Sequence, residues 1–307
     1  MKIIVTCPPM LCTKDQFVPI LEAKGFEVEC PNVTQTLTEK ELIKLIPDYD
    51  GWIIGDDPAT RKVFSAAKKG KLKAAVKWGI GIDNVDLDAC RNLGIPITNT
   101  PNMFGSEVAD LSIGYLLALA RETFFIDRDI RQGNWPKNQG ISLPGKTVGI
   151  IGYGDIGKRA ASRAKSFELN VIAYDPGKKD AEEGVDLQIW PNQINKCDFI
   201  IFTCALNKFN HHMLNKEIIS KCKDGVRIIN VARGPLIDEK SLCEALKNRK
   251  IHSAALDVFE VEPLPFNSYL RNHPLCILGS HNASNTIDAV KKTNMVAIDK
   301  LISFLEI

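Results

Sequence analysis

The chain has 307 residues, with 39 lysines and arginines against 37 aspartates and glutamates, and 45% of its residues are hydrophobic. A chain of this length is expected to form two domains with separate cores. Its balanced charge gives no electrostatic basis for binding nucleic acid or an anionic membrane. No apolar run approaches the roughly 18 residues that a membrane span needs, and the N-terminus has no signal-peptide layout.

The nine cysteines are scattered in mostly apolar surroundings and include no CxxC pair. This usage is typical of reduced cysteines in a cytoplasmic protein. Cysteines and histidines show no metal-ligand spacing, so we expect no metal site. Four of the five histidines lie in a polar loop or at turn edges, where a structural role is the more common one: His211, His212, His252 and His273.

The first hundred residues alternate between strand-like and helical patterns. Strands are expected at Ile3–Thr6, Phe26–Glu29, Trp52–Ile54, Ala74–Lys77 and Ile95–Thr98. Helices are expected at Asp15–Lys24 and Thr38–Ile46, the second of which opens with a capping box formed by Thr38 and Glu41. This alternation predicts a parallel sheet that is covered on both faces.

From Ser106 to about Arg131 the apolar spacing predicts one long amphipathic helix. Helices then alternate with six strands, expected at Val148–Ile151, Val171–Tyr174, Phe199–Thr203, Arg227–Val231, Ala254–Asp257 and Cys276–Leu278. Six strands are what a complete dinucleotide-binding sheet requires. A last amphipathic helix is expected over Thr286–Ile307.

The fold class is therefore α/β, with two doubly wound parallel-sheet domains. A Rossmann NAD-binding domain over residues 99–285 is expected as an insertion in a flavodoxin-like substrate domain, formed by residues 1–98 and 286–307. The chain would cross between them near residues 100 and 285, which would act as hinges. A cleft between two such domains is where hydride transfer is expected, because closure excludes water.

The segment after Val148–Ile151 points most directly to a ligand. Gly152, Gly154 and Gly157 form GxGxxG, in which the glycines permit a tight turn, the approach of a pyrophosphate and close helix–strand packing. The following helix N-terminus offers N–H groups to phosphate. Asp175, directly after the next strand, can accept hydrogen bonds from the adenosine ribose and would repel a 2′-phosphate. The pattern therefore favours NAD over NADP.

Three charged side chains lie beyond other strands of the same predicted sheet. Arg233 follows a buried strand, and its planar guanidinium matches a carboxylate bidentately. His281 suits proton transfer because the reference pKa of histidine, about 6.5, is close to working pH. Glu262 could hydrogen-bond the other ring nitrogen, set the tautomer and favour the imidazolium. Together they predict an alcohol–ketone oxidoreduction with Arg233 as the substrate anchor.

The chain resembles the D-isomer-specific 2-hydroxyacid dehydrogenases, and within them the phosphoglycerate dehydrogenase branch. The resemblance spans nearly the whole chain and rests on the GxGxxG segment, Arg233, His281 and these segments: Gly79–Asp86, Asn99–Asn102, Asn230–Gly234, Asp257–Phe259 and Glu262–Pro263. It implies that Arg233, Glu262 and His281 are catalytic, and that the enzyme is a homodimer formed largely through the cofactor domain and the helix after residue 100. It also implies NAD contacts from Asp155, Ile156, Asp175, Asp257 and the residues around Ala232. The other expected NAD contacts are Gly152, Gly154, Gly157, Pro176, Ala205, Val231, Arg233, His281 and Ala283. The expected substrate contacts are Lys77, Gly79, Ile80 and Arg233.

The sequence also departs from that family's pattern. Cys204–Leu206 stands where Pro-Leu is common, and Lys77 with Trp78 stands where phosphoglycerate dehydrogenases usually have Arg and a small residue. Lys77 keeps a cation, whereas Trp78 would enlarge a position next to the pocket. The regulatory domain of longer relatives is expected to be absent.

3-Phosphoglycerate is the leading expected substrate, and its 2-oxoacid is 3-phosphohydroxypyruvate. Glyoxylate, hydroxypyruvate and a phosphonate analogue are alternatives in the same class. An NAD-sensing corepressor or scaffold is the alternative of another class, although no low-complexity tail is present. A formate dehydrogenase is disfavoured because its chemistry needs no proton transfer, so a Glu/His pair would have no use there.

Overall fold

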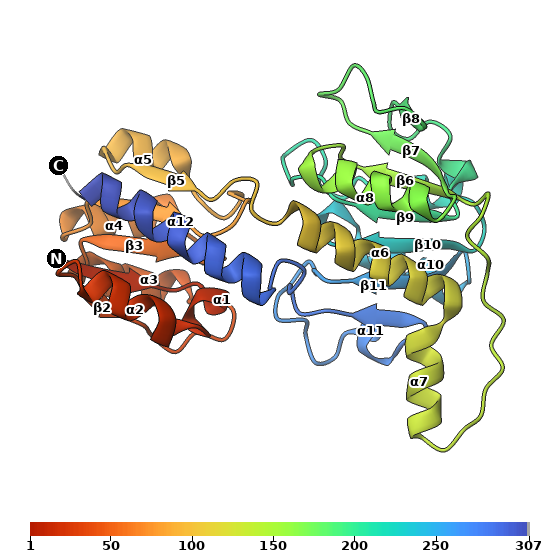
Figure 1. Cartoon of the computed structure of the whole chain (residues 1–307), viewed down its shortest axis with the longest axis horizontal. Coiled ribbons are helices and arrows are strands. Elements are labelled where there is room, and N and C mark those ends of the chain that lie inside the picture. The colour runs from red at the N-terminus through yellow and green to blue at the C-terminus, as the bar shows by residue number, and fades with distance from the viewer. Residues whose placement is uncertain (306–307) are drawn as a thin grey trace. The chain divides into compact units, whose positions relative to one another are not determined.

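The computed structural model describes residues 1–305, so the last two residues of the helix expected over Thr286–Ile307 lie outside the described residues (Figure 1). The chain divides into two compact units. Unit 1 combines Met1–Phe104 with the C-terminal segment from Asn285, and unit 2 is Gly105–Ser284. The domain boundaries predicted from the sequence differ from these by a few residues and stay predictions.

Unit 1 is built on a five-stranded parallel sheet in the order β2-β1-β3-β4-β5, which is the flavodoxin-like order. Its strands are β1 (Lys2–Val5), β2 (Glu27–Glu29), β3 (Gly51–Ile54), β4 (Ala74–Lys77) and β5 (Ile97–Asn99). The strands β3 and β4 are buried along their whole length, as expected for a sheet covered on both faces.

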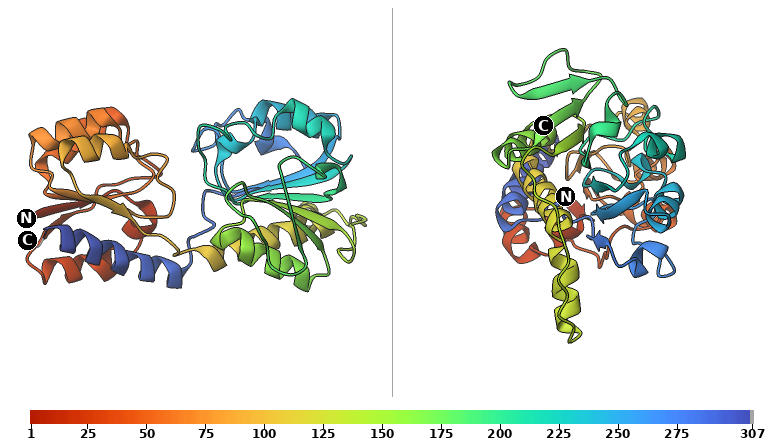
Figure 2. Two further views of the ribbon diagram at one scale, coloured as in Figure 1. Left: turned by 90° about the horizontal axis from the view of Figure 1, so that it is seen from above. Right: turned by 90° about the vertical axis from the view of Figure 1, so that its right-hand side faces the viewer.

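Helices cover both faces of this sheet (Figure 2). The helices of unit 1 are α1 (Pro8–Leu11), α2 (Lys14–Glu22), α3 (Glu39–Leu45), α4 (Arg61–Lys69), α5 (Leu87–Leu93) and α12 (Ile287–Leu305). The C-terminal α12 packs against β3 and β4, which brings the two ends of the chain into one unit. The predicted capping box is confirmed, because the Thr38 N–H donates to Glu41 Oε2 at 2.7 Å and the Glu41 N–H donates to Thr38 Oγ1.

Unit 2 holds a seven-stranded parallel sheet in the order β12-β11-β10-β9-β6-β7-β8. If these seven strands are numbered 1 to 7 from β6 to β12, the sheet read from β8 has the Rossmann order 3-2-1-4-5-6, followed by strand 7. The predicted fold class is therefore confirmed. The strands are β6 (Thr147–Ile151), β7 (Asn170–Tyr174), β8 (Val185–Gln188), β9 (Phe199–Phe202), β10 (Val226–Asn230), β11 (Ile251–Leu256) and β12 (Cys276–Leu278). Its helices are α6 (Gly105–Arg121), α7 (Thr123–Arg131), α8 (Asp155–Ser166), α9 (Lys216–Lys221), α10 (Glu239–Lys247) and α11 (Tyr269–Asn272).

The prediction of six strands in this sheet was wrong because it missed β8. This strand pairs in parallel with β7 at the edge of the sheet, with Val171 opposite Val185. It carries Asp186 and Gln188 and none of its residues is fully buried. An edge strand of this kind buries too little apolar surface to produce a recognisable hydrophobic pattern.

The single long helix expected to about Arg131 is two helices in the structure. The chain breaks at Glu122, which has a left-handed backbone with φ 57°. Glu122 is 8% exposed, and its side chain accepts a hydrogen bond from Asn138 Nδ2 at 2.9 Å. α6 packs along α8, whereas α7 extends away from the sheet (Figures 1 and 2). The apolar spacing runs through the break, so periodicity alone could not reveal it.

Two findings bear on the predictions from composition. All nine cysteines lie in the described part of the chain, and each is free of any disulfide. No helix among residues 1–305 is both long and apolar enough to cross a membrane.

Candidate active site

The glycine segment joins β6 to α8 in unit 2. Gly152 has φ +94°, and a Cβ there would lie 2.6 Å from the Cα of Cys204. A Cβ on Gly157 would lie 2.0 Å from the Gly152 carbonyl oxygen. Gly154 is the N-cap of α8, and a Cβ there would meet nothing within 4 Å. The fold itself therefore requires the first and third glycines, while open space above Gly154 lets a phosphate reach the helix N-terminus.

Asp175 lies directly after β7, beside this glycine turn. Its Oδ2 accepts a hydrogen bond from the Tyr153 N–H at 2.8 Å, and its Oδ1 accepts one from the Gly177 N–H at 2.8 Å. These two bonds hold the carboxylate at the edge of the sheet where a dinucleotide binds. The neighbouring Pro176 is exposed, as is Ala205 after β9. The residues expected at the adenosine end thus gather at one edge of one sheet.

His281 and Glu262 form an ion pair on two loops of unit 2. Nδ1 of His281 lies 2.8 Å from Oε2 of Glu262, and the two side chains are 22% and 20% exposed. The other carboxylate oxygen of Glu262 accepts a hydrogen bond from the Phe259 N–H at 2.9 Å. The backbone of His281 has φ 56° and donates its N–H to the Asp257 carbonyl at 2.6 Å. Glu262 is therefore held from within its own loop, whereas the backbone of His281 is held by the start of the loop that carries Glu262.

Arg233 is placed by a turn that follows β10. The Asn230 side chain donates to the Arg233 carbonyl at 2.8 Å and accepts from the Ala232 N–H at 3.0 Å. A Cβ on Gly234 would lie 1.9 Å from the Phe259 carbonyl carbon, so this turn packs directly on the loop that carries Glu262. Glycine at position 234 thus brings the arginine loop and the glutamate loop into contact.

Asp257 anchors the loop that carries His281. It is 1% exposed, and its Oδ2 accepts a hydrogen bond from the Ala283 N–H at 2.8 Å. Burial raises the pKa of Asp257, although hydrogen bonds from the backbone of Asn282 and Ala283 oppose that rise. Burial and the charge of Asp257 also raise the pKa of Tyr115, whose hydroxyl hydrogen-bonds Asp257. Asp257 and Ala283, both expected to contact NAD, therefore also bind each other.

Three residues that support this site were not found from the sequence. Asn230 and Gly234 flank the residues expected to contact NAD and substrate in their segment, and Tyr115 lies within an apolar helix pattern. The glycine directly after Arg233 was the one usable signal, because a glycine between buried residues can mark a close backbone contact.

The three substrate residues expected in unit 1 lie at the end of β4, where Lys77 is the last strand residue, and just after it. The Lys77 side chain is 4% exposed, and Nζ lies 3.1 Å from Asp56 Oδ1 and donates to the Trp78 carbonyl at 2.8 Å. Gly79 has φ +118° and donates its N–H to Thr100 Oγ1 at 2.8 Å. Ile80 is 36% exposed. The Lys77 charge is thus already balanced by a carboxylate of the same unit.

Trp78, which was expected to enlarge a position next to the pocket, has its side chain in the interior of unit 1. The indole is 4% exposed, and its Nε1 donates to Asn294 Oδ1 of α12 at 2.8 Å. Its ring lies 5.2 Å from that of Phe104. The large Trp78 side chain fits here because it packs in the interior of unit 1, between Phe104 and α12.

The fold and this arrangement define a dinucleotide-dependent dehydrogenase, and comparison with known proteins specifies the family. Residues 113–283 match the model of the D-isomer specific 2-hydroxyacid dehydrogenase NAD binding domain. The chain belongs to the D-isomer-specific 2-hydroxyacid dehydrogenase family. It is an oxidoreductase with NAD as its cofactor.

Three similar proteins illustrate the range of this family. A hydroxypyruvate reductase of Thermotoga maritima is 35% identical over 280 residues, covering 89% of this chain and 90% of the relative. A D-3-phosphoglycerate dehydrogenase of Methanocaldococcus jannaschii is 38% identical over 98% of this chain, which spans only 56% of that longer protein. The structure of an NAD-dependent formate dehydrogenase from Staphylococcus aureus in complex with NAD aligns with a TM-score of 0.88, at 25% identity, over 100% of this chain and 96% of the other.

Proposed function

We propose that this enzyme interconverts a small D-2-hydroxyacid and its 2-oxoacid, and that Arg233, Glu262 and His281 carry out the reaction. The observation that supports this most strongly is the 2.8 Å contact between His281 Nδ1 and Glu262 Oε2. Hydride removal from formate leaves no hydroxyl proton to transfer, whereas oxidation of an alcohol does. A histidine oriented by a carboxylate therefore favours the alcohol–ketone reaction.

His281 is the proposed acid and base. With Nδ1 directed at Glu262, the other ring nitrogen, Nε2, exchanges the proton with the substrate oxygen. The imidazolium donates that proton when the ketone is reduced, and the neutral ring accepts it when the alcohol is oxidised. Glu262 favours the imidazolium and holds the ring in one orientation. NAD, when bound, supplies the hydride acceptor, and NADH the hydride donor.

Arg233 is the proposed anchor for the substrate carboxylate. Its guanidinium can form two parallel hydrogen bonds to that group and so hold the reacting carbon in a fixed orientation. Support comes from its rigid turn, which Asn230 holds through two hydrogen bonds. The proposed contacts in unit 1 are Lys77 and the backbone of Gly79 and Ile80.

The proposed NAD contacts fit the edge of the unit 2 sheet. Open space at Gly154 and the tethered carboxylate of Asp175 suit a pyrophosphate and an adenosine ribose. The other proposed contacts are Gly152, Asp155, Ile156, Gly157, Pro176, Ala205, Val231, Ala232, Arg233, Asp257, His281 and Ala283.

The substrate proposed first is 3-phosphoglycerate, with 3-phosphohydroxypyruvate as its 2-oxoacid, because several relatives of 33–38% identity are D-3-phosphoglycerate dehydrogenases. One observation favours a second candidate, hydroxypyruvate or glyoxylate. The Lys77 ammonium is buried and paired with Asp56, so it would have to give up that carboxylate to bind a phosphate. The relative that matches this chain along 90% of its own length is a hydroxypyruvate reductase.

A panel of 2-oxoacids assayed with NADH tests both the reaction and the substrate. We expect turnover of at least one of these 2-oxoacids. The substrate with the highest kcat/KM among 3-phosphohydroxypyruvate, hydroxypyruvate and glyoxylate decides between the two candidates. Absence of turnover with every 2-oxoacid, together with intact NADH binding, would favour the NAD-sensing scaffold and contradict this proposal.

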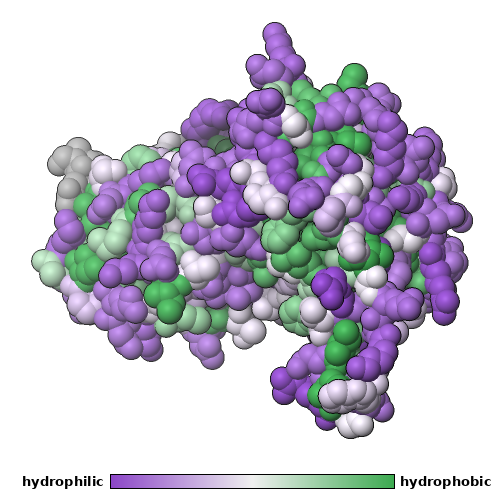
Figure 3. Space-filling model, turned by 45° about the vertical axis from the view of Figure 1, so that its right-hand side comes forward, coloured by the Kyte–Doolittle hydropathy of each residue, from purple (hydrophilic) through white to green (hydrophobic). Residues whose placement is uncertain are grey.

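We also propose a cytoplasmic homodimer. Support comes from α7 and the segment after it, which expose Phe124, Ile130 and Trp135 by 54%, 41% and 77%. Figure 3 shows apolar surface among the polar surface of this projecting arm. Exposed apolar side chains gathered on one element often mark a protein interface. Light scattering after size-exclusion chromatography should give twice the 34.0 kDa chain mass, and replacing Trp135 by Ser should shift the enzyme toward the monomer.

A further inference from the structure

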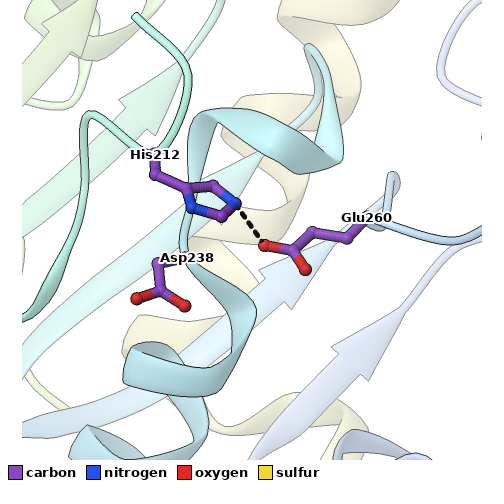
Figure 4. Close-up of side chains that lie close together, drawn as sticks. All are labelled: His212, Asp238 and Glu260. Carbon is purple, nitrogen blue, oxygen red and sulfur yellow. Dashed lines mark ion pairs between the residues drawn. The ribbon is translucent and has the colours of Figure 1, made fainter.

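Three side chains with metal-binding atoms meet in unit 2, outside the proposed catalytic set. They are His212, Asp238 and Glu260, which Figure 4 shows converging from three separate segments. One ligand atom from each lies within 4.8 Å of the other two. Nε2 of His212 is 2.7 Å from Oε1 of Glu260. Their separation in the sequence explains why residue spacing predicted no metal site.

Backbone hydrogen bonds hold His212 next to Asp238. The His212 N–H donates to the Pro235 carbonyl at 2.7 Å, and the Asp238 N–H donates to the Leu214 carbonyl at 3.1 Å. Leu214 and Ile237 form a parallel β-bridge between these two bonds. The two ligand-bearing positions are therefore adjacent irrespective of any interaction between their side chains.

The carboxylates are also oriented by neighbours. Asp238 caps α10, where its oxygens accept from the Ser241 N–H at 3.3 Å and from the Ser241 hydroxyl at 2.5 Å. The Glu239 N–H donates to Glu260 Oε1 at 3.1 Å, and the Glu260 N–H donates back to Glu239 Oε2 at 3.4 Å. Metal-ligating carboxylates are characteristically oriented by hydrogen bonds of this kind.

Charge at this position favours a cation. Asp238, Glu239 and Glu260 bring three carboxylates to the surroundings of His212. A divalent ion would balance most of their negative charge. One imidazole nitrogen with carboxylate oxygens suits Zn²⁺ or a related transition metal better than Mg²⁺ or Ca²⁺, which prefer oxygen alone.

We propose that His212, Asp238 and Glu260 form a binding site for a divalent transition metal ion of the zinc class, with water as the remaining ligand. Ligand atoms around tetrahedral Zn²⁺ lie roughly 3.4 Å apart. The hydrogen bond between His212 and Glu260 therefore opens slightly to admit the ion, while Asp238 moves closer. The ion would join the segments around residues 212, 238 and 260, and so stabilise the loop that leads to Glu262.

Metal titration of the full-length chain tests this site. After removal of metal with EDTA and dialysis, Zn²⁺ alone is titrated calorimetrically, and thermal melts are recorded with and without it. We expect one tight site per chain and a higher Tm with Zn²⁺, because an ion that binds only the folded state stabilises it. His212→Ala and Glu260→Gln should each weaken binding by at least about tenfold.

His211→Ala is the matched control, because the His211 ring centroid lies 3.9 Å from that of His212, with the ring planes tilted by 35°, yet His211 is no member of the cluster. It should bind Zn²⁺ like the wild type. Co²⁺ titrated into the wild type and Glu260→Gln adds a spectroscopic readout, since its visible absorption reports coordination. Circular dichroism shows that each variant is folded. The proposal would be overturned if the wild type had no tight site for Zn²⁺. It would also be overturned if His212→Ala and Glu260→Gln bound Zn²⁺ as tightly as the wild type does.

Discussion

Nδ1 of His281 lies 2.8 Å from Oε2 of Glu262, although 19 residues separate them in the chain. The contact arises because the two loops follow β11 and β12, which are neighbours in the parallel sheet. Phe259 fixes the carboxylate, and the Asp257 carbonyl fixes the histidine backbone. These contacts orient the pair, which suits the general acid–base role proposed for it.

The first prediction concerns the pH dependence of Glu262→Gln. In the wild type the reductive rate should fall at high pH as the imidazolium is lost, and the oxidative rate should rise with pH. Glutamine lacks the charge that favours the imidazolium, so both changes should move to lower pH. Steady-state rates in both directions across pH 5–10 measure this shift.

His281→Ala complements that experiment. It should lower kcat by about 10²- to 10⁴-fold while NADH still binds, as is typical for loss of a general acid. A histidine that served packing alone would leave the pH profiles intact and change thermal stability instead. Superimposable reductive profiles of the wild type and Glu262→Gln would refute the pairing.

The second prediction is that Arg233→Lys lowers kcat/KM for any accepted 2-oxoacid more than tenfold. Lysine keeps the charge but cannot form the two parallel hydrogen bonds. The affinity for NADH should change little, which fluorescence titration can measure. Arg91→Lys is a suitable control because Arg91 is exposed and paired with Asp88 on the surface. Near-normal kcat/KM in Arg233→Lys would remove the anchoring role.

The third prediction tests the choice of cofactor. Asp175→Ala should weaken NAD binding by about 2–4 kcal/mol, the contribution of two charge-assisted hydrogen bonds. It should also relax discrimination against NADP, because the repulsive charge is lost. Asp175→Asn should relax it too, while its single amide oxygen can still accept one of the two hydrogen bonds that Tyr153 and Gly177 donate to Asp175. A wild type that uses NADPH as well as NADH would show this reading of Asp175 to be wrong.

The fourth prediction separates the roles of two glycines. Gly157→Ala should lower Tm substantially, because the new methyl group would lie 2.0 Å from the Gly152 carbonyl oxygen. Gly154→Ala should lower Tm only slightly, since alanine is a poorer N-cap and meets no other atom. It should nevertheless weaken NAD binding about tenfold or more, because its methyl group occupies the space for phosphate. Equal affinities of Gly154→Ala and wild type for NAD would place the phosphate elsewhere.

The fifth prediction concerns stability at acid pH. Burial and the charge of Arg227 lower the pKa of His252, although Glu122 opposes this shift. In the unfolded chain, the histidine side chain takes up a proton near its reference pKa of about 6.5. The stability that the neutral ring contributes is therefore present above that pH and is lost as pH falls through it toward the folded pKa. His252→Gln should show a smaller decrease in Tm between about pH 7 and 5, and the exposed His211→Gln should behave like the wild type.

Local patterns in the sequence were sufficient to predict the glycine segment and both sheets apart from the edge strand β8. Alternating strands and helices imply parallel sheets whatever the details of packing. Strand ends in such sheets meet at one edge, which is why Arg233 and Asp175 could be assigned to a common binding edge before any coordinates were known. The acid–base chemistry of histidine and carboxylate suggested the roles of His281 and Glu262, and the family resemblance implied the same roles.

The tertiary structure decided what depends on contacts between distant residues. Three such features leave no periodic pattern in the sequence. They are the left-handed backbone at Glu122, the burial of Lys77 against Asp56, and the contact of Gly234 with Phe259. The meeting of His212, Asp238 and Glu260 is of the same kind. Periodicity reports which side of an element is buried, whereas these features depend on which residue of another element lies opposite, and only the folded chain determines that.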